Sequence, residues 1–175
     1  MLTFLLLVIA AVAVQGAHSY LLFSQRANRH WSISDHAVKN RQTHLIYFLG
    51  HFVGGGAWLL ATHRIFAEPR LHFIFWISFA TVMLEWLQAA VPSKVSYKFS
   101  WHAVFAYAMW LGCMTSIILG TILLQLATWQ RLLAGLCCAA VFAMYIWMHF
   151  PRAKVYRLQY ATIWCFFLGM LVLSF

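Results

Sequence analysis

The chain has 175 residues, of which 64% are hydrophobic and only 9% are charged, and its formal net charge is +9. Three acidic and twelve basic residues are too few to cover the surface of a water-soluble domain of this length. The composition therefore excludes a soluble globular protein and predicts a membrane protein. Because the basic residues lie in short connections and not on one continuous face, we expect no nucleic-acid partner.

Six apolar stretches are each long enough to cross a bilayer, which takes about 20 residues of helix for a hydrocarbon core ~30 Å thick. They predict an all-α, polytopic bundle in a single domain, residues 1–175. The first stretch lacks the basic segment of a signal peptide, so we interpret it as a span. The predicted spans are residues 2–23, 44–66, 71–91, 102–128, 132–150 and 155–174.

The first span carries His18, with Gln15 about one helical turn earlier. The connection that follows, residues 24–43, is the longest in the chain. Within it, residues 32–36 predict a short surface helix, because Ser34 or Asp35 could cap its start.

The second and third spans bring polar residues to one depth. His51 lies seven residues after His44, where the second span begins, and Glu85 lies six residues before the third span ends. At 1.5 Å per residue both are about 9 to 10 Å deep, measured from the same side. Glu85 is the only acidic residue inside a span, and Gln88 shares its helical face. That face must point into the bundle, because charge in the hydrocarbon core costs about 2.5 to 3.5 kcal/mol.

The fourth and fifth spans add further polar and small residues. Gly112, Ser116 and Gly120 recur at four-residue spacing, which predicts a close approach of another helix. His102 opens the fourth span, and Tyr145 shares a face of the fifth with His149 and Cys138. All four cysteines lie in apolar stretches, and we expect them to be buried thiols.

These residues converge because the first, third and fifth connections must lie on one side of the membrane. We predict a site for ligand binding or proton relay that is formed by Glu85, His51, His18, His102 and Gln88. Secondary positions are His44, His149, Tyr145 and Asp35. The alternative roles are hydrogen bonding between helices for His18 and His51, solvation at the membrane interface for His44, His102 and His149, and a structural pair of Glu85 with His51 or His102. The remaining histidines, His30, His36, His63 and His72, are expected at the surface.

The basic residues predict the orientation. Nine lie on the side of the first, third and fifth connections and only three on the other: Arg26, Arg29, Lys39, Arg41, Lys94, Lys98, Arg152, Lys154 and Arg157 against Arg64, Arg70 and Arg131. The positive-inside rule then places the nine in the cytoplasm and both termini outside, in a plasma membrane or bacterial inner membrane. The polar cluster falls in the cytoplasmic half.

Three functions fit this pattern, and the residues leave open whether the protein is an enzyme. The first is a pocket that binds a lipid or other amphiphile, or that supports proton-linked transport. The second is a haem or divalent-metal site on His51, His102, His18 or Glu85, with His51 and His102, or His18 and His149, as paired ligands. No His-x-x-x-His or Glu-x-x-His motif occurs in a span. The third is a non-catalytic accessory subunit that contacts other membrane subunits.

Three features resemble the DRAM family and related uncharacterised bacterial membrane proteins. They are the tripeptide Ile33, Ser34 and Asp35 in the first connection, the six spans with a long first connection, and Pro92 followed by His102. The resemblance implies a role linked to lipids or membrane remodelling, and it makes Asp35 and His102 the positions to test.

Overall fold

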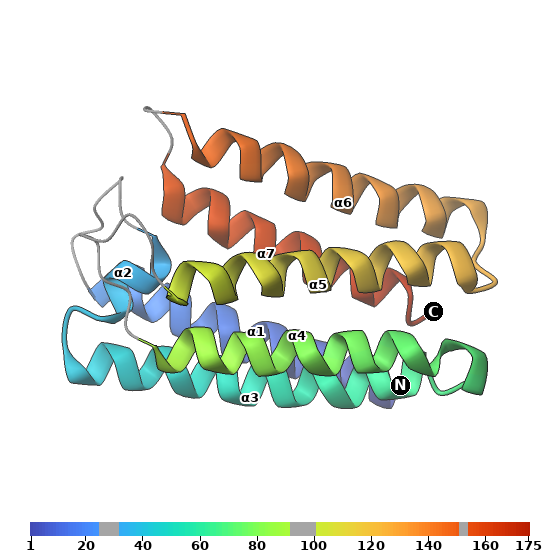
Figure 1. The fold of residues 1–175 in the computed structure, drawn as a ribbon, viewed down its shortest axis with the longest axis horizontal. Coiled ribbons are helices and arrows are strands. Elements are labelled where there is room, and N and C mark those ends of the chain that lie inside the picture. Colours follow the sequence, from blue (N-terminus) through green and yellow to red (C-terminus); the bar gives the residue numbers. More distant parts are fainter. Residues whose placement is uncertain (25–31, 92–100, 151–153) are drawn as a thin grey trace.

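The computed structural model describes residues 1–24, 32–91, 101–150 and 154–175. Those residues form seven α-helices and a short 3-10 helix, with no strand: α1 (Leu2–Ser24), α2 (Ile33–Ala37), α3 (Arg41–Ile65), η1 (Pro69–Leu71), α4 (His72–Ala90), α5 (Trp101–Leu123), α6 (Thr128–Met148) and α7 (Val155–Val172). Six helices are long and apolar enough to cross a membrane, and they run side by side along the long axis (Figure 1). The protein is thus an all-α integral membrane bundle with six candidate spans, as predicted.

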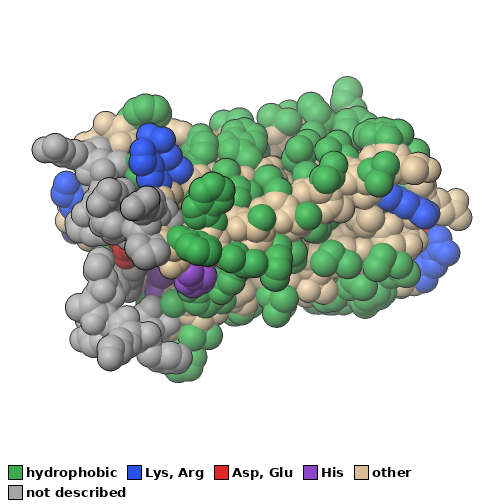
Figure 2. All heavy atoms as spheres, turned by 90° about the horizontal axis from the view of Figure 1, so that it is seen from above, with side chains coloured by type: hydrophobic (Ala, Val, Ile, Leu, Met, Phe, Trp, Pro, Cys, Tyr) green, Lys and Arg blue, Asp and Glu red, His purple; other side chains and the backbone are tan. Residues whose placement is uncertain are grey.

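The surface has the pattern of a membrane protein. Hydrophobic side chains cover the length of the face shown in Figure 2, and Lys and Arg side chains gather toward its two ends. His30, Pro92 and five of the basic residues used for the orientation lie outside the described residues: Arg26, Arg29, Lys94, Lys98 and Arg152.

Two predicted helix boundaries are wrong by more than three residues. α5 ends at Leu123 instead of at residue 128, and α6 begins at Thr128 instead of at residue 132. The cause is a local cap, because Gln130 Oε1 accepts a hydrogen bond from the Ala127 amide at 2.8 Å. This bond satisfies a backbone donor at the start of α6 and so starts that helix earlier.

The short helix α2 forms, but its cap and position differ from the prediction. Its N-cap is Ser32 and not Ser34 or Asp35: Ser32 Oγ accepts from the Asp35 amide, and the Asp35 carboxylate accepts from the Ser32 amide. α2 is also not a surface helix, because Ile33 and Ala37 are buried and His36 is fully buried. The surface position predicted for His36 is therefore wrong. α2 packs against α1, α3 and α7, and closes what we call the α2 end of the bundle.

Small residues set the closest helix contacts. Gly50 and Gly54 face Ala17 and Val14, so α3 lies directly against α1. Gly112 faces Thr81, and Ser116 Oγ lies 3.0 Å from the hydroxyl of Ser78, so α5 lies directly against α4. The small-residue face predicted on α5 is confirmed by these contacts.

Candidate functional site

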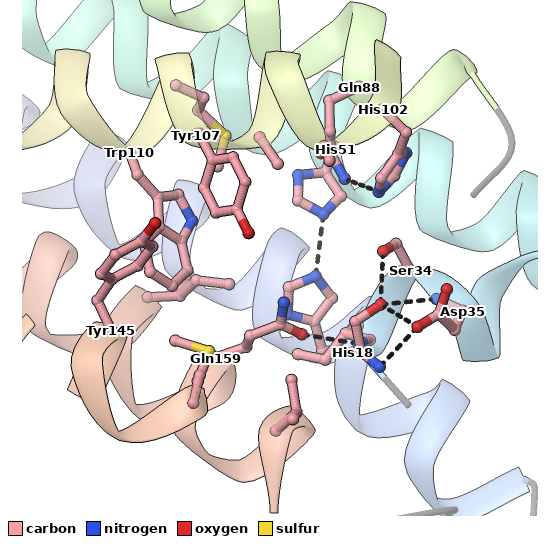
Figure 3. A pocket seen from close by; sticks show the side chains of 18 of the residues that line it. His18, Ser34, Asp35, His51, Gln88, His102, Tyr107, Trp110, Tyr145 and Gln159 are labelled. Atoms are coloured by element: carbon pink, nitrogen blue, oxygen red, sulfur yellow. Dashed lines mark hydrogen bonds between the residues drawn. The ribbon is translucent and has the colours of Figure 1, made fainter. Parts of the chain in front are cut away.

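Three predicted residues form one hydrogen-bonded chain across three helices. The Glu85 carboxylate on α4 lies 2.7 Å from Nδ1 of His51 on α3. The other ring nitrogen of His51, Nε2, lies 2.9 Å from Nε2 of His18 on α1 (Figure 3). His51 is 3% exposed and His18 only 1%. The structure thus brings together Glu85, His51 and His18, which lie up to 67 residues apart in the sequence.

Glycines allow this approach. The glycine contacts between α3 and α1 bring the backbone of His51 toward His18. On the neighbouring face of α3, a Cβ at Gly55 would lie 2.7 Å from the indole nitrogen of Trp86 and 3.2 Å from the Glu85 carboxylate. The Trp86 indole donates to the His51 carbonyl at 3.2 Å, which fixes α4 against α3 beside the chain.

The hydrogen-bonded chain of Glu85, His51 and His18 has the connectivity of a proton relay. Glu85 Oε1 accepts from His51 Nδ1–H, and a single proton lies between the two facing Nε2 atoms. His18 Nδ1 has no hydrogen-bond partner within the described part of the chain. A proton that reaches this atom can displace the His18 Nε2 proton to His51, which in turn passes its Nδ1 proton to Glu85.

A second hydrogen-bonded chain of side chains joins Tyr47, Gln88 and His102. The Gln88 amide donates to the Tyr47 hydroxyl at 2.7 Å and to His102 Nε2 at 3.0 Å. His102 Nδ1 donates to the Val91 carbonyl at 2.9 Å, so this pattern holds His102 as a neutral tautomer. Gln88 Oε1 is buried, with no partner among the described residues. The Tyr47 ring stacks on His18 and contacts His51, so the two chains pack together.

A cavity of about 440 Å³ lies at the α2 end, beside both chains. All seven α-helices contribute to its lining, which contains no Lys or Arg among the described residues. This volume is in the range of small-molecule sites. A smaller cavity of about 50 Å³ shares His51, Met109 and Ile163 with it, contains Glu85, and is otherwise mostly apolar.

Most of the predicted residues line the larger cavity, and two do not. His18, His51, His102, Gln88, Asp35, Tyr145 and His149 are part of its lining. Glu85 borders only the smaller cavity and reaches the larger one through His51. His44 lies apart from both, and one of its ring nitrogens lies 3.0 Å from the Ala89 carbonyl, which ties α3 to the end of α4.

Sequence reasoning missed several lining residues. Tyr47 lies four residues before His51 on the same face of α3, a spacing that could have found it. Gln159 is an amide inside an apolar span, and it accepts from the Ile33 amide at 2.8 Å. Tyr107 and Trp110 also line the cavity, but aromatic residues are common in spans and carried no signal.

The ring nitrogens of His51 and His102, one of the two histidine pairs proposed for a haem or metal, are used in protein hydrogen bonds. Both nitrogens of His51 and both of His102 have such partners. The two facing Nε2 atoms of His18 and His51 are 2.9 Å apart, and an ion bound between them at about 2.0 to 2.1 Å from each needs a wider gap. Within the described ranges, no three His, Cys, Asp or Glu side chains are grouped to hold a metal ion. A metal or haem on His51 and His102, or between His51 and His18, does not fit unless these bonds are replaced.

Because no family model, curated protein or solved structure matches this chain, the resemblance to the DRAM family stays a prediction.

Proposed function

We propose that this membrane protein binds the polar group of a lipid or other amphiphile in the 440 Å³ cavity, and that the chain of Glu85, His51 and His18 exchanges a proton with it. One observation carries the proposal. His18 is almost fully buried and lines the cavity, yet its Nδ1 has no partner among the described residues. Buried polar atoms without partners are rare, and a small turn of the ring toward the cavity would let a polar ligand group pair this one.

The two cavities suit a molecule with a polar and an apolar part. The larger one has amides, imidazoles, hydroxyl groups and a carboxylate among its lining, beside apolar side chains, and the smaller one is lined mainly by side chains such as Val82, Phe166 and Phe167. Because they share three lining residues, one molecule can place its polar group in the first and an apolar segment toward the second. With the predicted orientation, the polar group enters from the cytoplasmic half.

The hydrogen-bonded chain couples ligand binding to the charge of Glu85. A proton taken up at His18 Nδ1 ends on Glu85 and removes the charge of the only carboxylate in the six candidate spans. Because an ionised group is costly at this depth, its neutralisation changes which ligand charge the site favours. This coupling is what proton-linked transport needs.

The test replaces histidine by glutamine at two positions, one in the cavity and one away from it, and compares the amphiphiles that the two variants retain. His18→Gln keeps a polar atom near the position of Nε2, and with it a bond to His51, but removes Nδ1. The mass spectrum of lipids that copurify in mild detergent should show about tenfold less of the retained amphiphile. One hydrogen bond to a charged group is worth about 1.5 to 3 kcal/mol, and 1.4 kcal/mol is tenfold.

The control is His63→Gln. His63 is exposed and lies on α3, near the end of that helix away from the cavity, so this variant should retain the wild-type amount. Equal retention by His18→Gln and wild-type protein, with both monodisperse, would contradict the proposed site.

A further inference from the structure

One wall of the cavity is aromatic. Tyr107 and Trp110 on α5 and Tyr145 on α6 all line the cavity, and they gather on one side of it, away from Ser34 and Asp35 (Figure 3). The Tyr145 ring centroid is 5.7 Å from that of Tyr107 and 5.6 Å from that of Trp110. We call these three residues the aromatic wall.

The rings of the aromatic wall are steeply inclined to one another. The interplanar angle is 82° between Tyr107 and Tyr145 and 66° between Trp110 and Tyr145. Rings packed edge to face around a shared space turn their faces in different directions. None of the three is fully buried, so part of each surface is accessible. Aromatic ring faces that line a cavity bind quaternary ammonium groups, because each ring face carries negative electrostatic potential.

The charges around the cavity favour the same ligand. The whole chain has a net charge of +9, but among the described residues the cavity lining holds no Lys or Arg. It does hold the Asp35 carboxylate, which also caps α2. The hydrogen-bond pattern keeps His102 neutral. Among the described lining residues, a cation at the aromatic wall therefore meets ring faces and polar side chains and no Lys or Arg.

We infer that the aromatic wall binds a quaternary ammonium group, so that the ligand is an amphiphile with a choline-like headgroup. This inference rests on the proposed function and narrows it to one ligand class. Gln88 and His18 also line the cavity, and each has a buried polar atom with no partner among the described residues. A primary ammonium binds less well, because it is more strongly hydrated and has no methyl groups to contact the rings.

The experiment measures binding of three lysolipids with identical acyl chains to the full-length protein in maltoside detergent. They are lysophosphatidylcholine, lysophosphatidylethanolamine and lysophosphatidylglycerol. We expect the choline lipid to bind about tenfold more tightly than the other two, the size of a partly desolvated cation–π contact. Trp110→Leu and Tyr145→Leu, on different helices, should each remove most of that preference.

Two control variants distinguish the loss of an aromatic ring from a general destabilisation of the protein. Tyr145→Phe keeps the ring and should keep the preference, and Trp147→Leu changes an exposed tryptophan that does not line the cavity. If one leucine variant fails to fold, the other decides. Competition by choline chloride then identifies the source: displacement indicates that a soluble headgroup suffices, and lack of displacement indicates that the lipid tail is required. Either result supports the ammonium site.

Equal affinity for the three lysolipids, or a choline preference that survives both leucine variants, overturns the inference. In that case, binding that is weakened by His18→Gln leaves the proposed function standing. If no lysolipid binds and the purified protein retains no amphiphile, the proposed function fails as well.

Discussion

At the scale of single residues, the site depends on which ring nitrogens and amide atoms find partners. His51 uses both nitrogens, one on Glu85 and one on His18, whereas His18 uses one and Gln88 leaves its oxygen unpaired among the described residues. Buried groups with partners hold helices together, and buried groups without partners are rare. This difference distinguishes His18 and Gln88 from His51 and His102, whose ring nitrogens all have partners.

Glu85→Gln tests the proton chain. The glutamine oxygen can still accept from His51 Nδ1, so the amount of folded, monodisperse protein should stay within about twofold of wild type. The carboxylate that receives the proton is lost, so retention of the amphiphile should lose its dependence on pH. Lipid retention measured by mass spectrometry in a series of buffers of different pH provides the test.

Glu68→Gln is the matched control, because Glu68 is exposed and paired with Arg70. It should keep the wild-type pH dependence. Loss of folded protein in Glu85→Gln alone would assign Glu85 to structure.

At the scale of helices, close packing positions the site. His18 reaches His51 because α1 lies directly on the glycine face of α3, and Gln88 reaches His102 across the contact of α4 with α5. α6 and α7 pack mainly on each other. With α5 they bring the aromatic wall and Gln159 to the cavity.

Gly50→Ala should separate α1 from α3. A Cβ at Gly50 would lie 2.9 Å from the Ala13 backbone oxygen and closer still to the Ala17 side chain, and backbone cannot move aside easily. Overpacking of this kind costs about 1 to 3 kcal/mol, so we expect a lower unfolding temperature and less retained amphiphile. Thermal unfolding followed by circular dichroism in detergent measures the first effect.

Gly56→Ala is the comparison on the same helix, because no atom lies within 4 Å of a Cβ there. It should leave the unfolding temperature unchanged or raise it, since alanine is favoured over glycine in a helix by about 1 kcal/mol. Equal destabilisation by the two substitutions would show that the contact with α1 is not the cause.

At the scale of the whole molecule, the cavity and both hydrogen-bonded chains lie toward the α2 end of the bundle, where the helix ends carry Lys39, Arg41, Lys154 and Arg157. The orientation of that end decides from which side a ligand and a proton arrive. The positive-inside rule predicts the cytoplasm. Accessory partner subunits stay a prediction.

Reporter fusions test the orientation. Alkaline phosphatase fused after Phe175 should be active, because an even number of spans returns the chain to the side of its N-terminus. The same reporter fused after residue 150, which follows five spans, should be inactive, and green fluorescent protein should show the opposite pattern at the two positions. The reverse pattern would place the cavity in the outer half of the membrane.

The sequence by itself determined the fold class, the six spans and the shared depth of Glu85 and His51, because hydropathy, helical rise and connection order follow from local composition. It missed the burial of His36, the cap at Ser32, the early start of α6 and the roles of Tyr47 and Gln159. These features depend on which side chains contact each other across helices. The periodicity of a sequence indicates which face of a helix is buried, but not which residues that face contacts. Only the tertiary structure decided that His18, rather than His102, continues the chain from His51, because the approach of α1 to glycines on α3 selects that neighbour.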